Sequence, residues 1–156
     1  MINPSVARAL FLILVLVFSG RAFAVEHKVA CNSLPSAVQQ ESKTFLGGGT
    51  TLRGCVKDVS AGETTYEVEL LTSTGSKDVT FSATGDVLEI EQEVQESALP
   101  PVVAAAFEKA ARGGALGKIE SLTRKGQLAG YESTISQGGK RREVAFRPDG
   151  SAMKAD

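Results

Sequence analysis

The residues best placed to do chemistry are three glutamates that alternate along one predicted strand. Glu89, Glu91 and Glu93 occupy every second position of the segment 87–94. Because side chains two positions apart on a strand lie on the same face, the three carboxylates should line one face. Such a row could bind Ca²⁺ or a cationic partner. The favoured interpretation is simpler: a solvated sheet face with an apolar core behind it.

A second charged set, Lys140, Arg141 and Arg142, lies near the end of the chain. These side chains could meet an anionic partner, or they could pair across strands with Glu67 and Glu132. The favoured interpretation is a hairpin strand whose solvated charges discourage edge-to-edge pairing. The three glutamates and the three basic residues are the candidate partner-binding residues.

Catalytic patterns are missing from the sequence. Its one histidine, His27, stands close to the predicted amino terminus of the mature chain, where residues are often frayed and inert. There is no Gly-x-Ser-x-Gly nucleophile turn, no His-Glu-x-x-His helix and no phosphate-binding loop. The glycines at 47–49 are better explained as a helix stop. We therefore expect no enzymatic activity, no cofactor and no assigned metal ligands.

The two cysteines, Cys31 and Cys55, predict one disulfide if the protein reaches an oxidising compartment. A structural zinc site would need four ligands, and the chain offers two cysteines and one histidine. A lipoprotein cleavage site before Cys31 is rejected, because Lys28 stands three residues before it and the apolar run ends much earlier.

The first 24 residues have the pattern of a cleavable signal peptide. Arg8 precedes the apolar run from Ala9 to Phe18, and the triplet 22–24 supplies small residues for cleavage after Ala24. Ten apolar residues are too few for a transmembrane anchor, which needs roughly 20. Loss of this leader changes the formal charge from −1 to −3. A mildly acidic chain is a poor ligand for nucleic acid or for anionic membranes.

The rest of the chain matches itself at an offset of 65 residues, which is typical of an internal repeat. The matching pairs are Leu34-Pro35 with Leu99-Pro100, Val38 with Val103, Gly48-Gly49 with Gly113-Gly114, Tyr66-Glu67 with Tyr131-Glu132, and Val79, Phe81 and Gly85 with Val144, Phe146 and Gly150. In each unit the pattern predicts a helix that begins near a proline and ends at glycines, followed by strands with alternating apolar residues.

These elements predict an α+β fold: a tandem repeat of one helix packed on a three- to four-stranded antiparallel sheet, after a signal peptide. The boundaries are 1–24 for the signal peptide, 25–94 for the first repeat and 95–156 for the second. We expect short strands at 56–59 and 119–122, and a connector at 93–98 between the repeats.

The motif Leu-Pro-x-x-Val, a strand with Tyr-Glu, and then Val-x-Phe-x-x-x-Gly resembles the PepSY-like, beta-lactamase-inhibitor-like proteins of bacterial envelopes. The resemblance covers residues 34–153. It implies a helix on an antiparallel sheet in tandem, and it implies that some relatives inhibit secreted peptidases or beta-lactamases. The motif consists of positions that set the fold, and it contains no catalytic signature.

We therefore expect an exported, non-catalytic binding module of the bacterial envelope, periplasmic or secreted. It would inhibit or modulate a secreted or periplasmic enzyme through its exposed sheet face. The expected partner is another envelope protein, with no nucleic acid and no stable membrane anchor after cleavage. The alternative is a sensor of a small ligand or cation that uses the glutamate strand.

Overall fold

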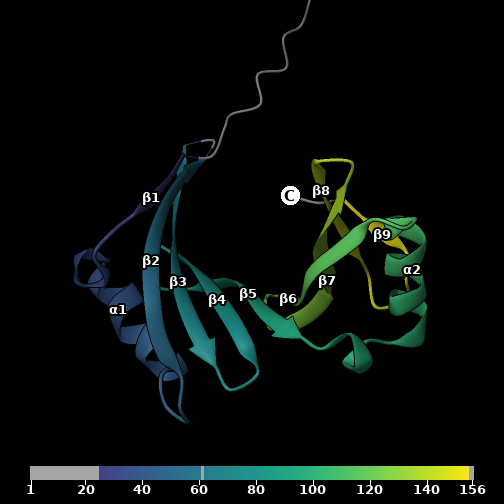
Figure 1. The fold of residues 1–156 in the computed structure, drawn as a ribbon. Coiled ribbons are helices and arrows are strands. Elements are labelled where there is room, and N and C mark those ends of the chain that lie inside the picture. Colours follow the sequence, from purple (N-terminus) through teal and green to yellow (C-terminus); the bar gives the residue numbers. More distant parts are fainter. Residues whose placement is uncertain (1–24, 61, 155–156) are drawn as a thin grey trace, which may run out of the picture.

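A computed structural model describes residues 25–60 and 62–154, so the predicted signal peptide lies outside the described residues. The fold is one nine-stranded antiparallel sheet whose strands follow each other in chain order (Figure 1). The strands are β1 (Val25–Lys28), β2 (Thr51–Ser60), β3 (Glu63–Thr72), β4 (Gly75–Ser82), β5 (Val87–Val94), β6 (Ala115–Arg124), β7 (Gln127–Gln137), β8 (Lys140–Phe146) and β9 (Ala152–Met153). In the described part of the chain, no helix is long and apolar enough to cross a membrane.

Alternating side chains give the sheet one apolar and one charged face. In β3, Val68 and Leu70 are buried, while Glu67 and Glu69, which alternate with them, point to the other side. Val79 and Phe81 continue the apolar face in β4 and are fully buried. This period of two is the pattern of a strand with a core on one side.

Two short helices cover the apolar face at opposite ends of the sheet (Figure 1). Helix α1 (Ser36–Ser42) places Val38 in a core with residues of β2, β3 and β4. Helix α2 (Pro101–Ala111) places Val103 and Phe107 in a second core with residues of β6 and β7. Three 3₁₀ turns flank the helices: η1 (Cys31–Ser33), η2 (Lys43–Phe45) and η3 (Glu96–Ala98). The sheet curves between the two cores, so its charged face is concave.

The predicted fold class is wrong. The structure is a mostly β protein with one continuous sheet, and it is not a tandem repeat of a helix on a separate three- to four-stranded sheet. Pairing of β5 with β6, from Glu89 opposite Arg124 to Val94 opposite Ile119, makes the sheet continuous across the middle of the chain. The strands expected to be short, at 56–59 and 119–122, belong to the ten-residue strands β2 and β6.

Cys31 and Cys55 form the predicted disulfide, with their Cα atoms 5.3 Å apart. It ties η1, which precedes α1, to strand β2, and Cys55 is buried in the first core. His27 is not at a frayed end as expected: it lies in edge strand β1, opposite Lys57 of β2, with its side chain exposed.

Candidate functional site

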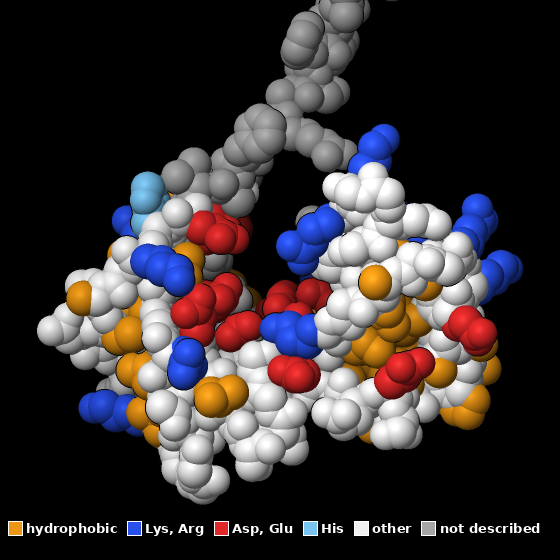
Figure 2. Space-filling model, in the orientation of Figure 1, with side chains coloured by type: hydrophobic (Ala, Val, Ile, Leu, Met, Phe, Trp, Pro, Cys, Tyr) orange, Lys and Arg blue, Asp and Glu red, His pale blue; other side chains and the backbone are white. Residues whose placement is uncertain are grey.

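Carboxylates from neighbouring strands gather on the concave face of the sheet, away from α1 and α2. Figure 2 shows acidic side chains in the hollow between the two ends of the molecule. We call this the acidic face, and its carboxylates are those of Glu67, Glu69, Asp78, Glu89, Glu91, Glu93, Glu120 and Glu132. In several pairs of cross-strand partners both residues are acidic. The pairs are Glu69 with Asp78, Asp78 with Glu91, Glu93 with Glu120, and Glu120 with Glu132. Like charges directly opposite each other destabilise a sheet, so this face opposes folding.

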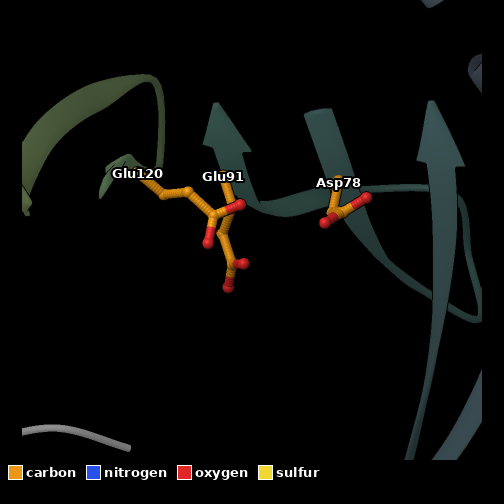
Figure 3. A group of neighbouring side chains, drawn as sticks. All are labelled: Asp78, Glu91 and Glu120. Carbon is orange, nitrogen blue, oxygen red and sulfur yellow. The ribbon is translucent and has the colours of Figure 1, made fainter. Parts of the chain in front are cut away.

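At the centre of the acidic face, Asp78, Glu91 and Glu120 form a three-carboxylate cluster (Figure 3). They come from β4, β5 and β6, and one carboxylate oxygen of each lies within 4.8 Å of the others. All three side chains are partly buried. Hard divalent cations such as Ca²⁺ bind to carboxylate oxygens, and three carboxylates could supply part of such a shell. Other oxygen ligands would complete it.

The carboxyl of Glu91 holds its proton unusually tightly. Burial, together with the charges of neighbouring acids, Glu120 first, raises the pKa of Glu91 to about 7. Leu122, which is 1% exposed, lies opposite Glu91 in the pairing of β5 with β6. A charged carboxylate beside a buried leucine loses hydration, which favours the neutral form.

Two more glutamates of the acidic face behave in the same way. Burial, together with repulsion from Asp78 and Glu69, raises the pKa of Glu67 to about 7. Burial also raises the pKa of Glu132, to about 8, together with the charges of Glu91 and Glu143 and a hydrogen bond to the Glu143 carboxyl. The pKa of Asp78 is also raised, mainly by burial. Near neutral pH the face is therefore partly protonated, and its charge changes with small changes in pH.

Basic side chains lie around the acidic face. Lys118 Nζ is 2.7 Å from Glu120 Oε1 and donates a hydrogen bond of 2.9 Å to Ser76 Oγ. Burial would lower the pKa of Lys118, but the hydrogen bond and charge of Glu120 outweigh it and raise the pKa. Arg124 pairs with Glu89 at the end of the pairing between β5 and β6.

The structure places the three predicted glutamates of β5 on one face, in three different environments. Glu91 belongs to the three-carboxylate cluster, and Glu89 pairs with Arg124. Glu93 Oε2 accepts hydrogen bonds from the backbone N–H and the hydroxyl of Ser76, at 3.0 and 3.2 Å. All three are partly buried, so this face is less solvated than the favoured interpretation held.

The predicted basic residues do not act as one patch. Lys140 is exposed at the start of β8. Arg141 lines a polar cavity beside Glu132 and Glu143. Arg142 points to the other side of the sheet, where it donates a hydrogen bond to the carbonyl oxygen of Ala110 in α2.

Sequence reasoning missed Asp78 and Glu120 as site residues, and it considered Glu67 and Glu132 only as possible cross-strand partners of the basic residues 140–142. The available signal was the alternation that places each of them on the charged face of its own strand. What joins them to Glu91 is the register of β4, β5 and β6, which no local pattern specifies.

A scan of protein-family models and a search of curated proteins both give no match to this chain. Solved structures with the same fold do exist. The chain resembles a BLIP-like protein from Bacteroides fragilis, with a TM-score of 0.59 and 20% sequence identity over 78% of this chain and 84% of that one. It also resembles a DUF2874 family protein from Bacteroides ovatus, with a TM-score of 0.62 and 17% identity over 78% of this chain and 86% of that one.

A candidate periplasmic protein from Bacteroides eggerthii matches with a TM-score of 0.62 and 12% identity, over 78% of this chain and 86% of that one. At these identities the likeness concerns the fold. It agrees with the beta-lactamase-inhibitor-like part of the sequence resemblance, whereas nothing in these comparisons supports the PepSY-like part.

Proposed function

We propose that this protein is an exported, non-catalytic binding module of the bacterial envelope, and that its acidic face binds a basic segment of another envelope protein. The observation that carries the proposal is the series of acidic cross-strand partners in the hollow of the sheet. A cationic partner would relieve their mutual repulsion and would be steered toward the hollow by its field. The captured protein would be a secreted or periplasmic enzyme that the module inhibits or modulates.

Location and lack of catalysis rest on separate support. The predicted leader and the disulfide fit an oxidising compartment outside the cytoplasm, and one structure of similar fold is a candidate periplasmic protein. The chain's one histidine lies exposed in an edge strand, and both cysteines are joined to each other. The histidine and the two cysteines therefore do not form the usual catalytic pair of a nucleophile with a general base.

The test is an affinity capture from envelope extract with the chain from Val25 onward. The wild type is compared with a variant that neutralises the acidic face, Glu67→Gln, Asp78→Asn and Glu91→Gln. The matched control neutralises three exposed acids on the helix side of the sheet, Glu41→Gln, Glu96→Gln and Glu108→Gln.

We expect the wild type and the control to capture the same stoichiometric protein at low salt, and the acidic-face variant to lose it. Added salt should weaken the capture, because exposed charges are screened. Equal capture by all three chains would contradict the proposal.

The three-carboxylate cluster supports a second candidate, a divalent cation sensor. A blank capture would favour it if calorimetry showed saturable Ca²⁺ binding that Asp78→Asn abolished. If the titration with Ca²⁺ gave no binding heat, this second function would be excluded.

A further inference from the structure

A polar cavity opens where the pairing of β6 and β7 is interrupted. Leu116 lies opposite Ile135, and the next aligned pair is Ile119 with Ser133. Two residues of β6, Gly117 and Lys118, are therefore opposite one residue of β7, Thr134. This is a β-bulge, which bends a strand and redirects its side chains. A Cβ at Gly117 would lie 3.0 Å from the carbonyl oxygen of Thr134, so the close approach of the two strands depends on glycine.

The cavity measures about 300 Å³, at the lower end of small-molecule sites. Both signs of charge line it. Lys118 of β6 and Arg141 of β8 supply the cations, and Glu120, Glu132 and Glu143 supply the carboxylates. An occupant that satisfies both sets must therefore carry a positive and a negative group within a short distance of each other.

The pair of Glu132 and Glu143 indicates where a cation would sit. Both residues line the cavity, and burial together with the neighbouring charges of Glu91 and Glu143 raises the pKa of Glu132. A ligand ammonium beside the two carboxylates would offset one of their two negative charges and reduce the repulsion between them.

We propose that this cavity binds a small zwitterion of the amino-acid type, with its ammonium at Glu132 and Glu143 and its carboxylate at Arg141. Arg141 suits this role because a guanidinium can bind a carboxylate through two parallel hydrogen bonds. The cavity shares Glu120 and Glu132 with the acidic face, but Glu67, Asp78 and Glu91, which the capture test substitutes, do not line it, so the two proposals can fail separately.

The test is calorimetric titration with alanine of either hand, and with two derivatives. N-acetylalanine lacks the ammonium, and alanine methylamide lacks the carboxylate. The protein variants are Arg141→Gln and the matched control Lys140→Gln, which removes the same charge from the adjacent exposed position.

We expect alanine to bind the wild type and Lys140→Gln equally, to bind Arg141→Gln at least roughly tenfold more weakly, and neither derivative to bind comparably. Amide chemical shifts of wild-type Gly117 and Ser133 should move during the titration, which locates the site without any variant. Absence of saturable binding at millimolar alanine would overturn the proposal. Equal affinity in both variants, or equal binding of the derivatives, would also overturn it.

Discussion

Single carboxyls on the acidic face show how far this surface departs from an ordinary solvated one. Glu91 lies opposite Asp78 on one neighbouring strand and Leu122 on the other, and burial together with nearby acids raises its pKa to about 7. The usual paired carboxylate stabilises a fold as pH rises, because its pKa is lowered. Here the direction is reversed, since a raised pKa means that the folded state binds the proton more tightly than the unfolded state.

The predicted consequence is that the protein is more stable in mild acid than in mild alkali. Between the ordinary glutamate pKa of 4.5 and about 7, folded Glu67 and Glu91 hold more protons than the unfolded chain does. Their contribution is complete below 4.5 and is lost as pH rises through 7. At pH 8, Glu91→Gln should raise the free energy of unfolding by about 1 kcal/mol, after discounting the shift for solvent screening.

Urea denaturation at pH 6 and pH 8 measures this effect. The control Glu96→Gln, at an exposed position in η3, should keep the wild-type dependence on pH. If the wild type were equally stable at both pH values, or if Glu91→Gln were less stable than the wild type at pH 8, the account of these carboxyls would be wrong.

At the residue scale, the sequence predicted which face of its own strand a residue occupies, but it did not predict which residues of other strands lie beside it. The alternation of Glu89, Glu91 and Glu93 correctly placed them on one face. It could not show that Asp78 and Glu120 would lie beside Glu91, because that depends on the register of separate strands.

At the scale of elements, the disulfide holds the first helix on the sheet. The cysteines are 24 positions apart, and the segment between them contains α1, whose buried contact with the core is Val38. A short helix of seven residues is not stable by itself, so its position depends on packing and on this covalent link.

The double variant Cys31→Ala and Cys55→Ala should lose about 3 kcal/mol of unfolding free energy, the loop-closure contribution for a loop of this length. Urea denaturation gives the value, and the chemically reduced wild type is the control for the volume lost at buried Cys55. A loss well below 1 kcal/mol in both would show that the link contributes little.

The error in fold class also belongs to this scale. The alternating patterns found the hairpin strands, and the motif Pro-x-x-Val found both helices. The lengths of β2 and β6 were underestimated because Arg53, Gly54, Gly117 and Lys118 interrupt their apolar alternation. Nor did any local pattern indicate that β5 and β6, separated by α2, pair directly and make one sheet.

At the scale of the molecule, both helices cover one side of the curved sheet and the acidic face occupies the other (Figures 1 and 2). The hollow is distinguished by its many acidic side chains, two of which pair with Lys118 and Arg124, and not by exposed apolar residues. A partner should therefore be basic where it enters the hollow, and its association should depend strongly on ionic strength.

The most direct test is carbodiimide labelling of carboxylates, read residue by residue by mass spectrometry, on the chain alone and in its captured complex. The account predicts that labelling of Glu67, Asp78 and Glu91 falls several-fold in the complex, while Glu41, Glu96 and Glu108 on the helix side react as before. Unchanged labelling of the acidic face, or protection confined to the helix side, would contradict the claim that the hollow of the sheet is the binding surface.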